Sequence, residues 1–231
     1  MKKLTAIILA ATLILSALAL SSCSCKSGNT VSIQTPTEPE LRDEYGVGYK
    51  VNDDGTLAVT NYNGADMDVS IPIDYEDKVV KNVAQSAFKG SDIESVTMPD
   101  GMKQIDGYAF ALCKKLNTVN IPEGVTTIGS NAFFATFALE EIELPETLET
   151  LELNAFNASA IKEIIIPKNV KTIGEYAFAD CSSLTSITVL GEKTMVASTA
   201  FNTGTDTKIP APKGSAAIKV AKENKLSYAE T

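Results

Sequence analysis

The strongest constraint on the fold is the dipeptide Ala-Phe, which recurs six times at intervals of 22 or 23 residues. The six pairs are Ala87-Phe88, Ala109-Phe110, Ala132-Phe133, Ala155-Phe156, Ala177-Phe178 and Ala200-Phe201. An aliphatic residue stands five positions before each Phe, and a block such as LNTVNIP follows the first five. Units of this length cannot bury their own apolar side chains, so the repeat predicts a solenoid in which neighbouring units cover one another.

Each unit is predicted to contain two short extended segments and one turn. In the block LNTVNIP at 116–122, Val119 and Ile121 alternate with polar residues, which indicates a strand with one buried face. The proline that ends the block has no N–H donor and suits the end of a strand. A second extended segment should end at Ile128, and a single helical turn over 130–135 should then carry the next Phe into the core.

The pattern I-G-x-x-A-F-x-x-C-x-x-L-x-x-I-x-I-P resembles the BspA-type leucine-rich repeats of bacterial surface proteins, over about residues 46–226. The resemblance implies an α+β repeat solenoid, a right-handed stack of about five to six units with short strands and short helical turns. It also implies an opening β-hairpin that turns at Asp54-Gly55, an incomplete repeat at 68–72, and a closing cap with a helix over about 215–224. The predicted boundaries are 46–82 for the hairpin and incomplete repeat, 83–201 for the repeats and 202–231 for the C-terminal cap.

The N-terminus has the pattern of an export signal. Two lysines precede an apolar run over 4–20, and Leu20-Ser21-Ser22-Cys23 resembles a lipobox, in which a peptidase cuts before the cysteine and the thiol carries diacylglycerol. A plain cleaved signal is the alternative. A transmembrane helix is disfavoured because the run is at the lower limit for a span and no positive cluster follows it. We therefore predict a signal peptide over 1–22, a flexible tether over 23–45, and a lipid anchor on Cys23 that holds the exported protein to the outside of the bacterial cell membrane.

Composition argues against several functions. The 231 residues include no histidine, Arg42 is the single arginine, and the formal net charge is −9. Without imidazole there is no serine–histidine or cysteine–histidine catalysis, and an acidic chain with one arginine is a poor nucleic-acid binder. Two S-x-x-K matches, at 86–89 and 159–162, fall inside the repeat and do not indicate acyl transfer, since no Lys-Thr-Gly follows. We expect no enzyme activity, no cofactor, no metal site and no nucleic-acid partner.

Two cysteines, Cys113 and Cys181, occupy the same repeat position, three residues after Phe. They lie three repeats apart, which is about 14 Å at about 4.8 Å per strand and exceeds the Cα separation that a disulfide allows. We therefore predict free, structural thiols.

The third and fourth repeats place acidic side chains on one face of a continuous, solvent-facing sheet. If Ile142 and Leu144 face the core, Glu141 and Glu143 face solvent, and Glu163 lies one strand along in the column of Glu141. We refer to these three glutamates as the acidic strip. Like charges in facing sheet positions repel one another, so the strip needs water, a cation or a basic partner nearby.

The acidic strip has two interpretations. It is either a solvated face that prevents sheet aggregation or, with the apolar residues beside it, a patch that docks a protein. The candidate binding face comprises Glu141, Glu143, Glu163, Ile165 and Phe134, and Phe137 either borders this face or fills the core.

Two functions fit these features. The first is a cell-surface lipoprotein that acts as a non-catalytic protein-binding or adhesion module, with a surface protein or glycan as its ligand. The alternative is a structural cell-envelope protein that contacts neighbouring envelope proteins or cell-wall polymer.

Overall fold

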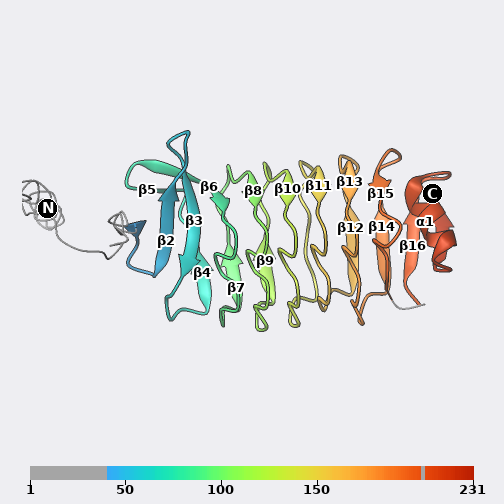
Figure 1. Cartoon of the computed structure of the whole chain (residues 1–231), viewed down its shortest axis with the longest axis horizontal. Helices are drawn as coiled ribbons and strands as arrows, with labels where there is room; N and C mark the ends of the chain where they lie inside the picture. Colours follow the sequence, from blue (N-terminus) through green and yellow to red (C-terminus); the bar gives the residue numbers. More distant parts are fainter. Residues whose placement is uncertain (1–40, 204–205) are drawn as a thin grey trace, which may run out of the picture. The chain divides into compact units, whose positions relative to one another are not determined.

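A computed structural model describes residues 41–203 and 206–231, which form a solenoid (Figure 1). A column of stacked phenylalanines lies in its interior. The rings of Phe88, Phe110, Phe133, Phe156, Phe178 and Phe201 are each at most 1% exposed. From Phe88 to Phe178 the neighbouring rings are stacked with centroids 5.1–5.7 Å apart, and the last pair is tilted at 6.5 Å. The predicted core residues of the repeat are therefore confirmed.

One face of the solenoid is a ten-stranded sheet to which every repeat contributes one strand. The repeat strands are β6 (Lys78–Val83), β8 (Gln104–Ile105), β10 (Thr127–Ile128), β11 (Thr150–Leu151), β13 (Thr172–Ile173) and β15 (Met195–Val196). They are parallel and in register, so that Ile128 is aligned with Ile105 on one side and with Leu151 on the other. Each of these aliphatic side chains is fully buried.

The same sheet begins with the predicted hairpin. Strand β2 (Val47–Val51) pairs antiparallel with β3 (Leu57–Tyr62), and Gly55 in the turn between them has a φ of 81°. Strand β3 then pairs parallel with β6, and β5 (Asp74–Tyr75) pairs antiparallel with β6. Strand β1 (Leu41–Arg42) pairs antiparallel with β2, so residues 41–45, predicted as the end of the tether, belong to this sheet and its first turn.

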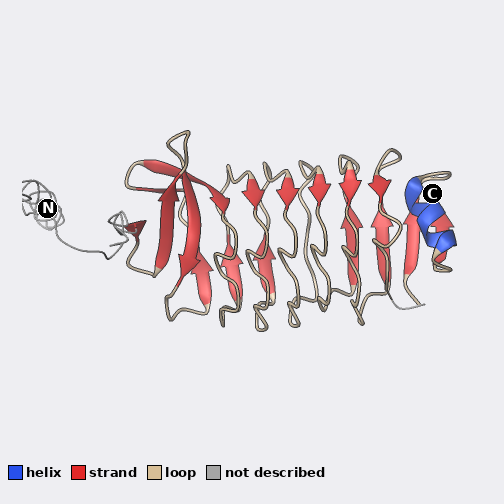
Figure 2. Ribbon diagram, in the orientation of Figure 1, coloured by secondary structure: helices blue, strands red, loops and turns tan. Residues whose placement is uncertain are grey.

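The second face differs from the prediction, because its sheet is interrupted in the third repeat. A three-stranded sheet consists of β4 (Asp68–Ser70), β7 (Ser95–Thr97) and β9 (Thr118–Asn120), and a four-stranded sheet consists of β12 (Glu163–Ile166), β14 (Ser186–Val189), β16 (Lys208–Ala211) and β17 (Ser227–Glu230). On this second face, the segment of the third repeat that lies between β9 and β12 is drawn as loop (Figure 2), and residues 139–145 contain no strand. The predicted continuous sheet is therefore wrong at the segment that carries Glu141 and Glu143.

The predicted helical turn at each Phe is also wrong. Asn131 and Ala135 have φ angles of 59° and 56°, so left-handed residues flank Phe133 on both sides. The N–H groups of Asn131, Phe133 and Ala135 donate to three carbonyl oxygens of the next repeat at 2.8–2.9 Å. A left-handed residue costs roughly 1–2 kcal/mol, and here the conformation lets alternate N–H groups all point toward the following unit.

Three residues after each of the first five phenylalanines stands a small polar side chain, and four of these five side chains donate to a phenylalanine carbonyl. Thr136 donates its hydroxyl to the Phe133 oxygen at 2.9 Å, and Cys113 donates its thiol to the Phe88 oxygen of the preceding repeat at 2.9 Å. Cys181 makes the equivalent bond at 3.1 Å. Both cysteines are buried and free, as predicted, and burial raises the pKa of each thiol.

The described chain contains one α-helix, α1 (Ala216–Glu223), within the segment predicted as helical. Ser215 caps its N-terminus by accepting from the Ile218 N–H, and Asn224 ends it. The buried side of α1 consists of Ala217, Ile218, Val220 and Ala221. This helix contacts strands β15, β16 and β17, at the C-terminal end of the repeats.

Replacing Phe133 with Ala should lower the free energy of unfolding by about 3–5 kcal/mol, because it removes a fully buried ring from the middle of the column. Phe137→Ala is the matched control, since Phe137 is 56% exposed and should cost about 0.5 kcal/mol or less. Denaturant titration of both variants measures the two losses. Equal losses would show that the stack of rings does not hold the units together.

Candidate binding face

The alternation predicted for the acidic strip is present. Glu141, Glu143 and Glu163 are exposed, whereas the adjacent Ile142 and Ile164 are 8% and 3% exposed. Ile165, the apolar member of the candidate face, is 59% exposed and lies on β12.

A hollow of about 300 Å³ lies beside the strip, at the interruption of the sheet. It is lined by 117–121, which includes β9, and by Glu141, Ile142 and Glu143 of the third repeat. The apolar residues Val119, Ile121 and Ile142 along it are each 8% exposed, whereas Ile187 at the equivalent position of β14 is fully buried. The interruption thus opens the sheet slightly toward the core.

The backbone hydrogen bonds show where the sheet is interrupted. Among the described residues, Glu141, Ile142 and Glu143 make no hydrogen bond from backbone to backbone. The preceding Glu140 makes one, because its carbonyl accepts from the Lys162 N–H at 3.0 Å. We call the turn around each Phe, residues 131–135 in the third repeat, the phenylalanine arc. The third repeat keeps its place through the hydrogen bonds of this arc, while its outer segment is not paired on either side.

The side chain of Asn120 contributes to the hollow on the β9 side. Its amide oxygen accepts from the Met98 N–H at 2.7 Å, and its amide nitrogen donates to the Met98 carbonyl at 3.1 Å. Both bonds turn Asn120 toward the preceding repeat and away from Glu143. The space between the two residues is consequently open to solvent.

The charges around the strip are unbalanced. Four carboxylates, those of Glu140, Glu141, Glu143 and Glu163, share this part of the surface with the Lys162 ammonium group, which forms an ion pair with Glu140. The carboxylate of Glu140, and more weakly that of Glu141, raises the pKa of Lys162. Within the described chain, Glu141, Glu143 and Glu163 have no ion-pair partner. Sequence reasoning missed Lys162, although its place one repeat after Glu140 was a usable signal.

Two phenylalanines are placed differently from the glutamates. Phe134 is half-buried on the arc of the Ala-Phe turn, where its carbonyl accepts from the Leu112 N–H at 2.8 Å, so it does not lie on the outer strand with the strip. Phe137 is 56% exposed and does not fill the core, because Leu139 occupies that place and is fully buried.

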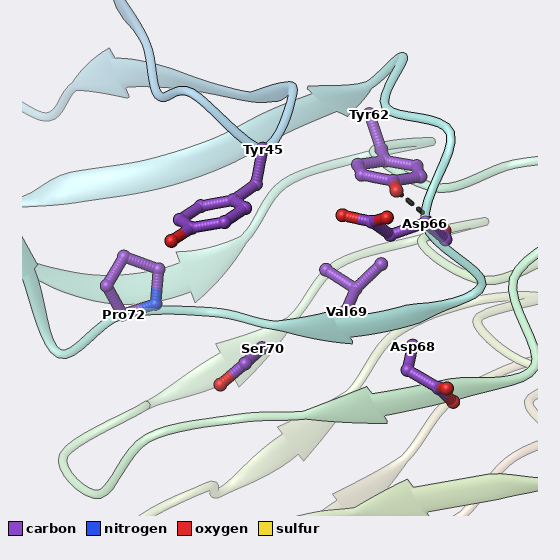
Figure 3. A pocket seen from close by; sticks show the side chains of 7 residues that line it. All are labelled: Tyr45, Tyr62, Asp66, Asp68, Val69, Ser70 and Pro72. Atoms are coloured by element: carbon purple, nitrogen blue, oxygen red, sulfur yellow. Dashed lines mark hydrogen bonds between the residues drawn. The ribbon is translucent and has the colours of Figure 1, made fainter.

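A second hollow, of about 410 Å³, lies near the N-terminal end of the repeats and had no counterpart in the sequence analysis. Its lining comes from the first turn, the end of β3, the loop after it and β4: Tyr45, Tyr62, Asp66, Asp68, Val69, Ser70 and Pro72 (Figure 3). The lining residues are scattered over nearly thirty positions with no shared motif, so no sequence pattern marked them.

Comparison with known protein families shows to which family this chain belongs. Six copies of the family model described as "BspA type Leucine rich repeat region" match residues 81–208, which is more than half of the chain. The chain belongs to the BspA-type leucine-rich repeat family. Proteins with these repeats are typically bacterial surface proteins, and leucine-rich repeat solenoids are generally non-catalytic binding modules. No curated protein sequence matches this member of the family.

Solved structures with the same fold come from several bacteria. A leucine-rich repeat protein of T. pallidum is 23% identical with a TM-score of 0.61, over 73% of this chain and 84% of that one. A leucine-rich repeat protein from Bacteroides ovatus is 21% identical with a TM-score of 0.57, over 83% and 67% of the two chains. The pneumococcal vaccine antigen PcpA is 20% identical with a TM-score of 0.61, over 82% of this chain and 49% of that one. At these identities the likeness shows the fold alone.

Among the described residues, no group of three or more acidic or cysteine side chains is arranged to hold a metal ion. Nor does that part of the chain include a helix with the length and apolarity needed to cross a membrane.

Proposed function

We propose that this protein is an exported, lipid-anchored surface module that binds a basic segment of another protein through the acidic strip. The observation that supports this function is the hollow at the interrupted sheet, which places carboxylates without an ion-pair partner among the described residues beside apolar side chains that are 8% exposed. A lysine- or arginine-rich partner would relieve the repulsion among the glutamates and cover Val119 and Ile142. The membrane anchor would keep this face outside the cell.

The test is partner capture followed by charge reversal. The full chain, in mild detergent, is used to capture proteins from a cell-surface extract, and association rates of each captured partner are then measured at rising salt. Association should slow as salt rises, because the screening length falls from about 10 Å at 0.1 M to about 3 Å at 1 M. Glu141→Lys with Glu163→Lys should slow association by about tenfold or more at low salt, since opposite charges act mainly on the on-rate.

The matched control is Glu175→Lys with Glu192→Lys. These two glutamates are exposed, belong to no ion pair among the described residues and lie outside the strip, so the reversal changes net charge equally. The control should bind as the native chain does. If both reversals bind equally well, the strip is a solubility face and the proposed site is wrong. If nothing is captured and cross-linking in cells joins the protein only to envelope neighbours or cell-wall polymer, the structural alternative is favoured.

The lipid anchor is proposed at Cys23, which lies outside the described residues and rests on the LSSC sequence after the apolar run. Cys23→Ala should move the protein from the membrane fraction to the soluble fraction, because no thiol would remain at the cleavage position to carry the lipid. Cys25→Ala is the control and should stay in the membrane fraction. Retention of Cys23→Ala in the membrane, uncleaved, would identify the apolar run as a transmembrane anchor instead.

A further inference from the structure

One wall of the hollow near the N-terminal end of the repeats is the turn at 43–46, which hydrogen bonds hold in place. The Asp43 carboxylate accepts from the Tyr45 N–H at 3.0 Å and from the Tyr49 hydroxyl at 2.6 Å. Arg42, the only arginine of the chain, donates to the Gly46 carbonyl at 2.7 Å. The side chain of Tyr45 is nevertheless 60% exposed, so a rigid turn presents an open aromatic ring to solvent. Because the backbone of the turn is already fixed, a ligand that contacts Tyr45 does not have to order the turn when it binds.

A glycine brings the second aromatic ring to the same place. A Cβ atom on Gly64 would collide with the Tyr45 carbonyl oxygen and would lie 2.6 Å from the Tyr62 hydroxyl. Only glycine therefore allows this loop to lie against both tyrosines. The Tyr62 hydroxyl then donates to the Asp66 carbonyl at 2.7 Å, which fixes the loop around the hollow.

The polar groups of the hollow include both acceptors and donors. The Asp66 carboxylate points into it beside the Tyr62 ring (Figure 3) and has no side-chain hydrogen bond or ion pair among the described residues. Strand β4 pairs with β7 on one side only. The residues that flank it continue this pairing, because the Met67 carbonyl accepts from the Ser95 N–H and the Ile71 N–H donates to the Thr97 carbonyl. Because backbone groups alternate along a parallel strand, those of Asp68 and Ser70 face the unpaired side, toward the hollow.

We propose that this hollow is a carbohydrate-binding subsite for one or two sugar units of an oligosaccharide. A sugar ring has an apolar C–H face that can lie on Tyr45 or Tyr62, and hydroxyl groups that both donate and accept hydrogen bonds. Those hydroxyls match the Asp66 carboxylate, which only accepts, and the free N–H and C=O groups of β4. A volume of about 410 Å³ is within the range of small-molecule sites.

Two other ligands fit less well. An extended peptide could add to the open edge of β4, but this strand has three residues and Pro72 soon follows it without an N–H donor. A cationic ammonium group could lie between the tyrosines and Asp66, but it would leave the N–H groups of β4 without an acceptor. The hydroxyl groups of a sugar can donate to the Asp66 carboxylate and can also accept from the N–H groups of β4.

The test is a binding titration of the full chain in mild detergent with four tetrasaccharides: maltotetraose, cellotetraose, mannotetraose and chitotetraose. At least one should bind by calorimetry. Tyr45→Ala should weaken it by about tenfold or more, equal to about 1.4 kcal/mol, and Asp66→Ala should weaken it similarly. Tyr228→Ala, at an exposed tyrosine on β17, is the matched control and should bind normally.

The outcomes separate this site from the acidic strip. Glu141→Lys with Glu163→Lys should leave sugar binding unchanged, so failure of the proposed protein-binding function would not affect this result. The proposal is overturned if none of the four sugars binds at concentrations up to about 10 mM, which corresponds to a binding free energy of about −3 kcal/mol. It is also overturned if Tyr45→Ala and Asp66→Ala both bind the sugar as the native chain does. Binding of a lysine-containing peptide or of tetramethylammonium at this hollow, with no sugar binding, would also overturn it.

Discussion

Every part of this solenoid depends on the contact between the phenylalanine arcs of neighbouring repeats. A unit of 22 or 23 residues cannot cover its own apolar side chains, and each stacked ring is buried only because the next unit lies about one ring spacing away. Burial of one such ring contributes about 1.5–3 kcal/mol. In each of the first four arcs, three N–H groups donate to the following repeat, so rings and backbone set the same spacing.

Because the phenylalanine arcs hold neighbouring repeats together, the sheet on the outer face can be interrupted without separating them. In the third repeat the arc keeps its hydrogen bonds to Leu153, Ala155 and Asn157, whereas Glu141, Ile142 and Glu143 make none through their backbones. The acidic residues lie where the sheet is not paired, so regular stacking of the repeats does not depend on them. The N-terminal hollow has the same origin, because β4 is an edge strand with one side left open.

Much of the core could be predicted from the sequence, because the period and the apolar alternation both depend on burial alone. The six phenylalanines and the inward Ile142 are examples. The hairpin turn at Gly55 was instead predicted from the family resemblance and from the Asp-Gly pair in the turn. The arc could not be predicted, since a helical turn and an alternation of left- and right-handed residues carry a similar number of residues around one bend. The exposure of Phe137 was undecided because two large apolar residues, Phe137 and Leu139, compete for one core position.

The sites were less predictable than the core. The outward direction of Glu141 and Glu143 followed from alternation, but the hollow beside them depends on the amide of Asn120 bonding to the preceding repeat. Side-chain hydrogen bonds of this kind leave no periodic signal. The tyrosine hollow depends on Gly64 lying against Tyr45, a contact that only the folded hairpin creates.

The central claim is that the phenylalanine arc holds the third repeat in the stack while its outer strand is unpaired. Amide hydrogen exchange of the native full chain, followed residue by residue by NMR, tests it directly. The Phe133 amide should be protected as strongly as those of Phe178 and of Ile187 in β14, and the Ile142 amide should exchange at least about a hundredfold faster. Equal protection of Ile142 and Ile187 would mean that the sheet is continuous, and would contradict the account.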